Sequence, residues 1–202
     1  MRWFAAVALV ATMAACAPRR VYLDRDVMTA VVLAPLNDSM DAEAPWKMWK
    51  YVEREVAARG YAVVPHAVVE KFYMDKKFTG DPGQIKSYDS KELAKIFNAD
   101  AVVWSNLAEW GKKTLVIYTS IEVKLEAELR DREDNVLWTG KGEHGESTSA
   151  RSGKKGLWDT LGATLTDPEK YAPQAAANCF ASLPWAGWDP EAKRTDAPPL
   201  GK

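Results

Sequence analysis

Histidine is scarce in this chain of 202 residues, and neither sign of charge is in excess. Only His66 and His144 are present, and 27 basic against 28 acidic residues leave a formal net charge of −1. Such a balance provides no global field to attract nucleic acid or an anionic membrane surface. Hydrophobic residues make up 47% of the chain, which is enough for the core of one domain. The composition therefore predicts a single globular domain that does not bind nucleic acid.

Catalytic signatures are also missing from the sequence. It contains no G-x-S-x-G motif, and "GKKG" at 153–156 lacks the glycine spacing of a phosphate-binding loop. We therefore predict a protein that is not an enzyme, with no catalytic residue, no metal ion and no cofactor. One catalytic alternative stays open: His144 stands between Glu143 and Glu146, and a hydrolase or metal centre could form around it.

The apolar run that opens the chain is too short to span a bilayer. It follows Arg2, extends from Trp3 to Met13, and is followed by two alanines and Cys16, which is the layout of a secretory signal peptide. The string "MAAC" also resembles the lipobox of bacterial lipoproteins, in which the cysteine becomes the new N-terminus. We predict that residues 1–15 are removed as a signal peptide and that Cys16 carries the acyl chains of a membrane anchor.

Lipidation of Cys16 predicts where the protein resides and what the second cysteine does. Ala17, rather than Asp, follows the anchor, so we expect sorting to the outer membrane, facing the periplasm, with surface exposure as an alternative. Residues 16–26 would form a short tether to the folded body. Cys179 then has no partner within the chain, and its apolar helical surroundings favour a buried free thiol over an intermolecular bridge.

Hydrophobic periodicity predicts one α/β (α+β) domain over residues 27–186, with a mixed, mostly antiparallel sheet flanked by helices. The clearest signal is the alternation of apolar and polar residues from Leu115 to Leu129, which predicts a long strand with one dry and one wet face. Asp89 and Glu92 predict a capping box at a helix start. The Pro-rich, charged residues 187–202 are expected to form a flexible tail. The expected strands are 27–36, 60–65, 99–110, 115–129 and 135–143.

Nine tryptophans are the most distinctive feature of the composition. Four of them are expected to fill the space between helices and sheet: Trp46, Trp49, Trp104 and Trp138. Trp110, Trp185 and Trp188 stand near predicted element ends or in loops. Exposed tryptophan is enriched in interaction surfaces and at the membrane–water boundary, so these three are the predicted binding residues.

Four strings of the sequence together resemble a family of bacterial lipoproteins of unknown function that includes a meningococcal surface lipoprotein antigen. The strings are "VVLAPLNDSMDAEAP", "GYAVVPHAVVE", "FNADAVVW" and "LEAELRDREDNVLWTG", and they lie between Val27 and Gly140. The resemblance implies a fold similar to the N-terminal domain of TolB and to the curli-secretion lipoprotein. It also implies a partner, a curli-type export lipoprotein, and it brings no catalytic residues.

Three hypotheses for function follow from these observations. The first is an outer-membrane-anchored periplasmic lipoprotein that acts as an accessory or binding component of an envelope or secretion assembly. It would contact membrane lipid through Cys16 and an envelope protein through its surface, and its sheet edges could pair in a homodimer. The second is a small-molecule or glycan-binding lipoprotein that uses aromatic residues in regions 104–110 and 138–144. The third is the hydrolase or metalloenzyme centred on His144.

Overall fold

The computed structural model describes residues 21–23, 26–115, 118–149 and 167–187. Its sheet has the strand order β3-β1-β4-β5-β6, and β2 also pairs with β4. The strands are β1 (Thr29–Val32), β2 (Leu36–Asn37), β3 (Ala62–Val63), β4 (Ala101–Leu115), β5 (Tyr118–Asp131) and β6 (Val136–Ser149). β1 runs parallel to β3 and β4, and β2 parallel to β4, whereas β4, β5 and β6 are antiparallel. The predicted fold class is confirmed.

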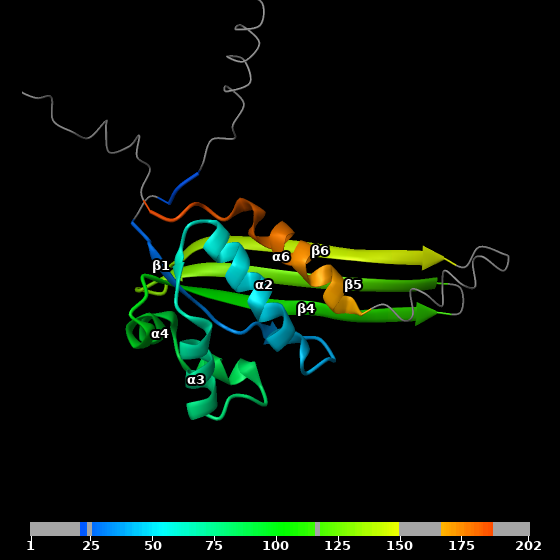
Figure 1. Cartoon of the computed structure of the whole chain (residues 1–202), viewed down its shortest axis with the longest axis horizontal. Coiled ribbons are helices and arrows are strands. Elements are labelled where there is room, and N and C mark those ends of the chain that lie inside the picture. The colour runs from blue at the N-terminus through cyan, green and yellow to red at the C-terminus, as the bar shows by residue number, and fades with distance from the viewer. Residues whose placement is uncertain (1–20, 24–25, 116–117, 150–166, 188–202) are drawn as a thin grey trace, which may run out of the picture.

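Two helices, α2 and α6, cross the same face of the sheet, while α3 and α4 lie to one side of it (Figure 1). The helices are α2 (Ala44–Ala58), α3 (His66–Asp75), α4 (Ser90–Phe97) and α6 (Ala172–Cys179). Short 3₁₀ helices are η2 (Pro82–Ser87), η3 (Pro168–Tyr171) and η4 (Phe180–Ser182). Within the described part of the chain, none of these helices has the length and apolar character needed to cross a membrane.

The alternating pattern of β5 places its apolar side chains under the helices. Five alternate residues of this strand are buried, namely Ile121, Val123, Leu125, Ala127 and Leu129. The residues between them remain partly or fully exposed on the opposite face. Because successive side chains of a strand point to opposite faces, one amphipathic strand separates the core from the open side of the sheet. The predicted dry and wet faces are confirmed.

The core beneath α2 is built on β1 and the residues that follow it. Residues 30–34 are at most 1% exposed, and they pack under Met48, Trp49 and Val52 of α2. The indole Nε1 of Trp49 donates a hydrogen bond to the carbonyl oxygen of Val32 at 3.0 Å, which satisfies the one polar atom of this buried ring. Trp49 therefore occupies the space between helix and sheet, as predicted.

Small residues allow α6 to approach β6 closely. The side of α6 that faces the sheet carries Ala175, Ala176 and Cys179, all of them buried. Opposite them lies Gly142, where a Cβ atom would overlap the backbone of Ala175 and Cys179. Cys179 is a buried free thiol, as predicted, and burial raises its pKa to about 12.

Two of the hairpin strands are longer than predicted, whereas the strand predicted over 115–129 is β5 and starts only at Tyr118, because Leu115 belongs to β4. β4 was expected to turn at Gly111 but runs on to Leu115, because β5 continues to pair with it and places Glu122 opposite Gly111. β6 was expected to end at Glu143 but reaches Ser149. The predicted strand 27–36 is instead divided into β1 and β2. Pairing between strands therefore extends elements beyond the point at which local residue preferences would end them.

Asp100 joins the starts of β1 and β4. Its Oδ2 accepts hydrogen bonds from Thr29 Oγ1 at 2.7 Å, from Thr29 N at 2.9 Å and from Met28 N at 3.2 Å. Its Oδ1 lies 2.8 Å from Nη2 of Arg132. Burial alone would raise the pKa of Asp100, but these hydrogen bonds and the Arg132 guanidinium lower it on balance.

We expect Asp100→Ala to lower the free energy of unfolding by about 2 kcal/mol at neutral pH, because the N–H groups of Met28 and Thr29 lose a charged acceptor. A carboxyl group with a lowered folded-state pKa stabilises the fold above its unfolded-state pKa, and this contribution is lost as the pH falls through the folded-state value. The difference between the native protein and the variant should therefore shrink below the ordinary value of 3.8. Urea unfolding at pH 7 and pH 2.5 would measure it, and an equal deficit at both values would contradict the assignment.

Candidate functional site

The face of the sheet opposite α2 and α6 carries a band of polar side chains. The strand register places Trp104 opposite Glu128, which in turn lies opposite Thr139. One step along the strands, Glu126 lies between Asn106 and Lys141 in the same way. Directly opposed residues share a face, so side chains from three strands converge here.

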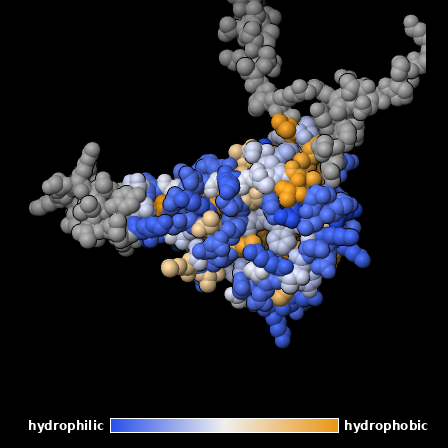
Figure 2. Space-filling model, turned by 180° about the vertical axis from the view of Figure 1, so that it is seen from behind, coloured by the Kyte–Doolittle hydropathy of each residue, from blue (hydrophilic) through white to orange (hydrophobic). Residues whose placement is uncertain are grey.

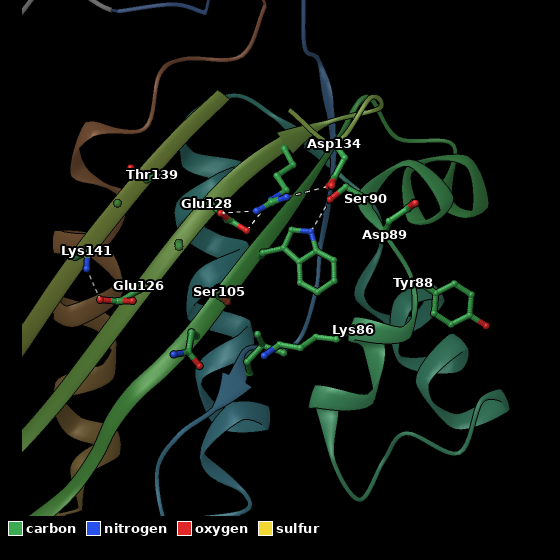
Figure 3. A pocket seen from close by; sticks show the side chains of 16 residues that line it. Lys86, Tyr88, Asp89, Ser90, Ser105, Glu126, Glu128, Asp134, Thr139 and Lys141 are labelled. Carbon is green, nitrogen blue, oxygen red and sulfur yellow. Dashed lines mark hydrogen bonds and ion pairs between the residues drawn. The ribbon is translucent and has the colours of Figure 1, made fainter. Parts of the chain in front are cut away.

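A cavity of about 440 Å³ lies where this band meets the segment from η2 to α4. The sheet forms its floor, and Lys86, Tyr88, Asp89 and Ser90 form the side wall. In Figure 3, Lys86 extends from η2 toward the sheet, while Glu128 projects from β5. The cavity has the size of sites that hold small molecules.

Trp104 provides the aromatic surface of the cavity and is held in one orientation. Its Nε1 donates to Ser90 Oγ at 2.9 Å, and Ser90 is only 1% exposed. Ser90 is the first residue of α4, where Asp89 and Glu92 form the predicted capping box. Trp104 was expected to fill space between a helix and the sheet. It does lie beside α4, but on the open face, where its half-buried ring lines the cavity.

Charged side chains around Trp104 are paired with one another. Arg130 contacts Glu128 at 2.7 Å and Asp134 at 3.2 Å, and Lys141 lies 2.6 Å from Glu126. A hydrogen bond from Ser90 lowers the pKa of Asp134, and Arg130 acts in the same direction. The cavity therefore offers fixed hydrogen-bond donors and acceptors around one aromatic ring. Its described lining includes no histidine or cysteine that could act as a base or nucleophile.

Comparison with known proteins shows the family of this chain. The family described as "Putative lipoprotein GNA1162-like" matches residues 23–167. The chain belongs to this family. A relative from Neisseria meningitidis serogroup B, "Putative lipoprotein NMB1124/NMB1162", is 28% identical over 154 residues, or 73% of this chain and 71% of the relative. The resemblance noted in the sequence is confirmed.

One solved structure agrees with this family assignment. The crystal structure of lipoprotein GNA1162 from Neisseria meningitidis has a TM-score of 0.55 and 27% identity, and the match covers 68% of this chain and 95% of that chain. A PelC dodecamer from Paraburkholderia phytofirmans has a TM-score of 0.49 and 19% identity, with 82% of this chain and 95% of that chain covered.

The three tryptophans predicted to bind a partner lie in different settings. Trp110 is only 4% exposed, so its expected place at a strand end is wrong: the extension of β4 makes it a core residue. Trp185 is half-buried, and the guanidinium carbon of Arg59 lies 5.8 Å from its ring centroid. Trp188 and the predicted lipidation site Cys16 lie outside the described residues.

In the described part of the chain, His144 and Glu143 lie on opposite faces of the sheet, so the three groups of the histidine alternative do not converge. The register pairs Glu143 with Lys124 on the open face, whereas His144 pairs with Val123 on the face under α6. Glu146 accepts a hydrogen bond from the hydroxyl of Tyr171, and the ring of His144 lies 5.7 Å from that of Tyr171. Among the residues that the structure describes, no group of three or more His, Cys, Asp or Glu side chains is placed to hold a metal ion.

Sequence reasoning identified part of the cavity and missed the rest. The regions 104–110 and 138–144, proposed for a small-molecule site, do supply Trp104, Thr139 and Lys141. The stretch that supplies Lys86 and Tyr88 precedes the predicted helix start at Asp89 and was given no role in a site. Nothing in its local pattern indicates that it faces β4, because that placement depends on how the helices pack against the sheet.

Proposed function

We propose that this protein is a lipid-anchored, non-catalytic binding component of a cell-envelope assembly, facing the periplasm from the outer membrane. Membership of a lipoprotein family supports the anchor, as does the lipobox-like string that ends at Cys16. Ala17 after the anchor supports sorting to the outer membrane. The described cavity, which has paired charges and no catalytic set, supports binding rather than catalysis.

The observation that carries this proposal is the open face of the sheet. An antiparallel sheet can leave one face in water. Here that face also holds a cavity, a fixed tryptophan, two groups of paired charges and the hydrogen bond from Asn106 to Asp38. Paired charges on a rigid sheet favour a specific partner, because a wrong partner would leave them unmatched. The family resemblance makes a curli-type export lipoprotein the first partner to look for, with a second copy of this chain as the next.

In-cell crosslinking followed by pull-down from solubilised envelopes tests the proposal. We expect the native protein to capture a defined set of envelope proteins and Glu126→Lys to lose them, since the reversal places a third cation beside Lys124 and Lys141. Arg54→Glu is the matched control, because it reverses an exposed charge on α2, across the sheet from the open face. Equal capture by both variants would show that the open face is not the binding surface, and an empty lane for the native protein would contradict the accessory role.

A second candidate, binding of a small molecule or glycan, is favoured by the cavity itself. A sugar presents a flat C–H face suited to an aromatic ring and hydroxyl groups suited to paired carboxylates and amides. Trp104 and Leu36 supply the first kind of contact, and Asn106, Glu126 and Glu128 supply the second. This arrangement, with an aromatic surface and few polar groups that converge on it, is typical of ligand sites.

Titration with chitotetraose, a neutral oligosaccharide, tests this second candidate. We expect the tryptophan fluorescence of the native protein to change with ligand, and Trp104→Ala to weaken binding about tenfold, equivalent to about 1.4 kcal/mol of lost ring contact. Trp185→Ala, which removes a half-buried tryptophan that does not line the cavity, should bind as the native protein does. If the two variants weaken binding equally, or if no oligosaccharide alters the emission, the glycan assignment fails.

A further inference from the structure

Apolar side chains are exposed at the end of the domain where the described chain begins and ends. Val21 is 66% exposed and Met28 is 48% exposed, although both are large hydrophobic residues. Trp185 lies beside them and is half-buried. Figure 2 shows hydrophobic surface gathered at this end, next to the undescribed termini. We call Val21, Met28 and Trp185 the apolar end.

Backbone hydrogen bonds hold the apolar end in place. Trp185 N donates to Val21 O at 2.8 Å, and Gly187 N donates to Val27 O at 2.9 Å. Gly187 has a φ of 84°, and a Cβ there would lie 3.1 Å from Sδ of Met28. Met28 N is fixed by Asp100 on its other side. The exposure of these side chains therefore belongs to the fold and does not come from a fraying terminus.

The short distance to the anchor indicates what covers this surface. Only five residue steps separate Cys16 from Val21, a reach of at most about 18 Å when fully extended. Arg19 and Arg20 lie within that stretch. Cations next to an anchor are attracted to anionic lipid headgroups. The guanidinium of Arg59 over the Trp185 ring adds a third cation at the same end.

We propose that the apolar end rests in the headgroup boundary of the bilayer that holds the acylated Cys16. This proposal depends on the lipid anchor of the proposed function. Val21, Met28 and Trp185 enter the interface, and the nearby arginines meet lipid phosphates. The bound orientation then follows from the strands: β4 starts beside Met28 and carries Lys113 roughly 40 Å away from the membrane. The cavity around Trp104 lies on the membrane-proximal half of the domain.

Two other occupants are less well matched to this surface. The segment 188–202 has six charged residues and only two large apolar ones, Trp188 and Leu200, so it offers little to cover an apolar end. A second copy of the chain would bring a like cluster of arginines against Arg59. Neither occupant explains why this surface lies so close to Cys16, whereas a bilayer that holds the acylated Cys16 does.

Nitroxide labels on single cysteines test the orientation directly. Acylated protein carrying Met28→Cys is labelled and reconstituted in vesicles of phosphatidylethanolamine and phosphatidylglycerol. Lys113→Cys, exposed at the far end of β4, is the matched control. Cys179, at 1% exposure, does not compete for the label. The collision rate with oxygen, relative to that with a water-soluble nickel chelate, should be severalfold higher at position 28 than at position 113, because oxygen concentrates in lipid.

The outcomes separate this proposal from the anchor on which it depends. If the native protein does not float with the vesicles, the anchor itself fails. If it floats but the ratio of oxygen to nickel collisions at position 28 is as low as at position 113, the apolar end does not contact the bilayer. Spin–spin broadening at position 28 would instead identify a second copy as the occupant. Protection from both collision partners that disappears when residues 188–202 are deleted would identify the tail, and either result overturns the proposal.

Discussion

Replacing Cys16 by alanine is expected to move the protein from the membrane fraction to the soluble fraction. Each buried methylene contributes roughly 0.8 kcal/mol, so one acyl chain binds marginally while a diacylglycerol group with an N-linked chain holds firmly. No described helix could replace that anchor by spanning the bilayer. Fractionation of envelopes after a carbonate wash, with an alkyne-tagged palmitate as tracer, measures both location and acylation.

Cys179→Ala is the matched control for this experiment. Cys179 is buried under β6 and its thiol pKa is raised, so it is not expected to carry an acyl group. The control should stay in the membrane fraction and retain the tracer. If Cys16→Ala remained membrane-bound, or if the tracer were lost only in Cys179→Ala, the assignment of the anchor would be wrong.

The parts of the fold that sequence predicts well depend on local patterns. The alternation along β5 requires only neighbouring residues and a single buried face, and the structure follows it from Ile121 to Leu129. The capping box at Asp89 and Glu92 is similarly local, since both hydrogen bonds join residues three positions apart. Because such patterns depend only on residues that are close together in the sequence, they can be recognised without a structure.

Only part of the candidate site can be predicted from the sequence, because its residues are brought together by the packing of elements that are far apart in the chain. Trp104 and Trp138 occupy similar sites in predicted strands, yet one lines the open cavity and the other packs 5.3 Å from the ring of Phe180 under η4. Trp110 was misplaced because nothing local shows that β4 continues past Gly111. The pairing of Asn106 with Asp38, 68 residues away, likewise depends on β2 lying beside β4.

Gly142→Ala is expected to lower the free energy of unfolding by about 3 kcal/mol, because the added methyl group has no room beneath α6. The atoms it would meet are the backbone of Ala175 and Cys179, which cannot rotate away as a flexible side chain could. To accept the methyl group, α6 must lift from β6, which opens the packing around Cys179. The thiol should then react faster with a disulfide reagent while the sheet persists. Urea unfolding and thiol titration measure the two effects.

Gly111→Ala is the matched control, since it places the same methyl group on another long strand of the sheet, β4, where nothing lies within 4 Å of the new Cβ. Its stability should change by less than about 1 kcal/mol, in the stabilising direction, because alanine restricts the unfolded chain more than glycine does. Cys179 should stay unreactive in this variant. If both variants were equally destabilised, the backbone freedom of glycine would explain the effect, and the close approach of α6 would not. A loss of stability confined to Gly142→Ala would show that Gly142 is needed because it leaves room for α6.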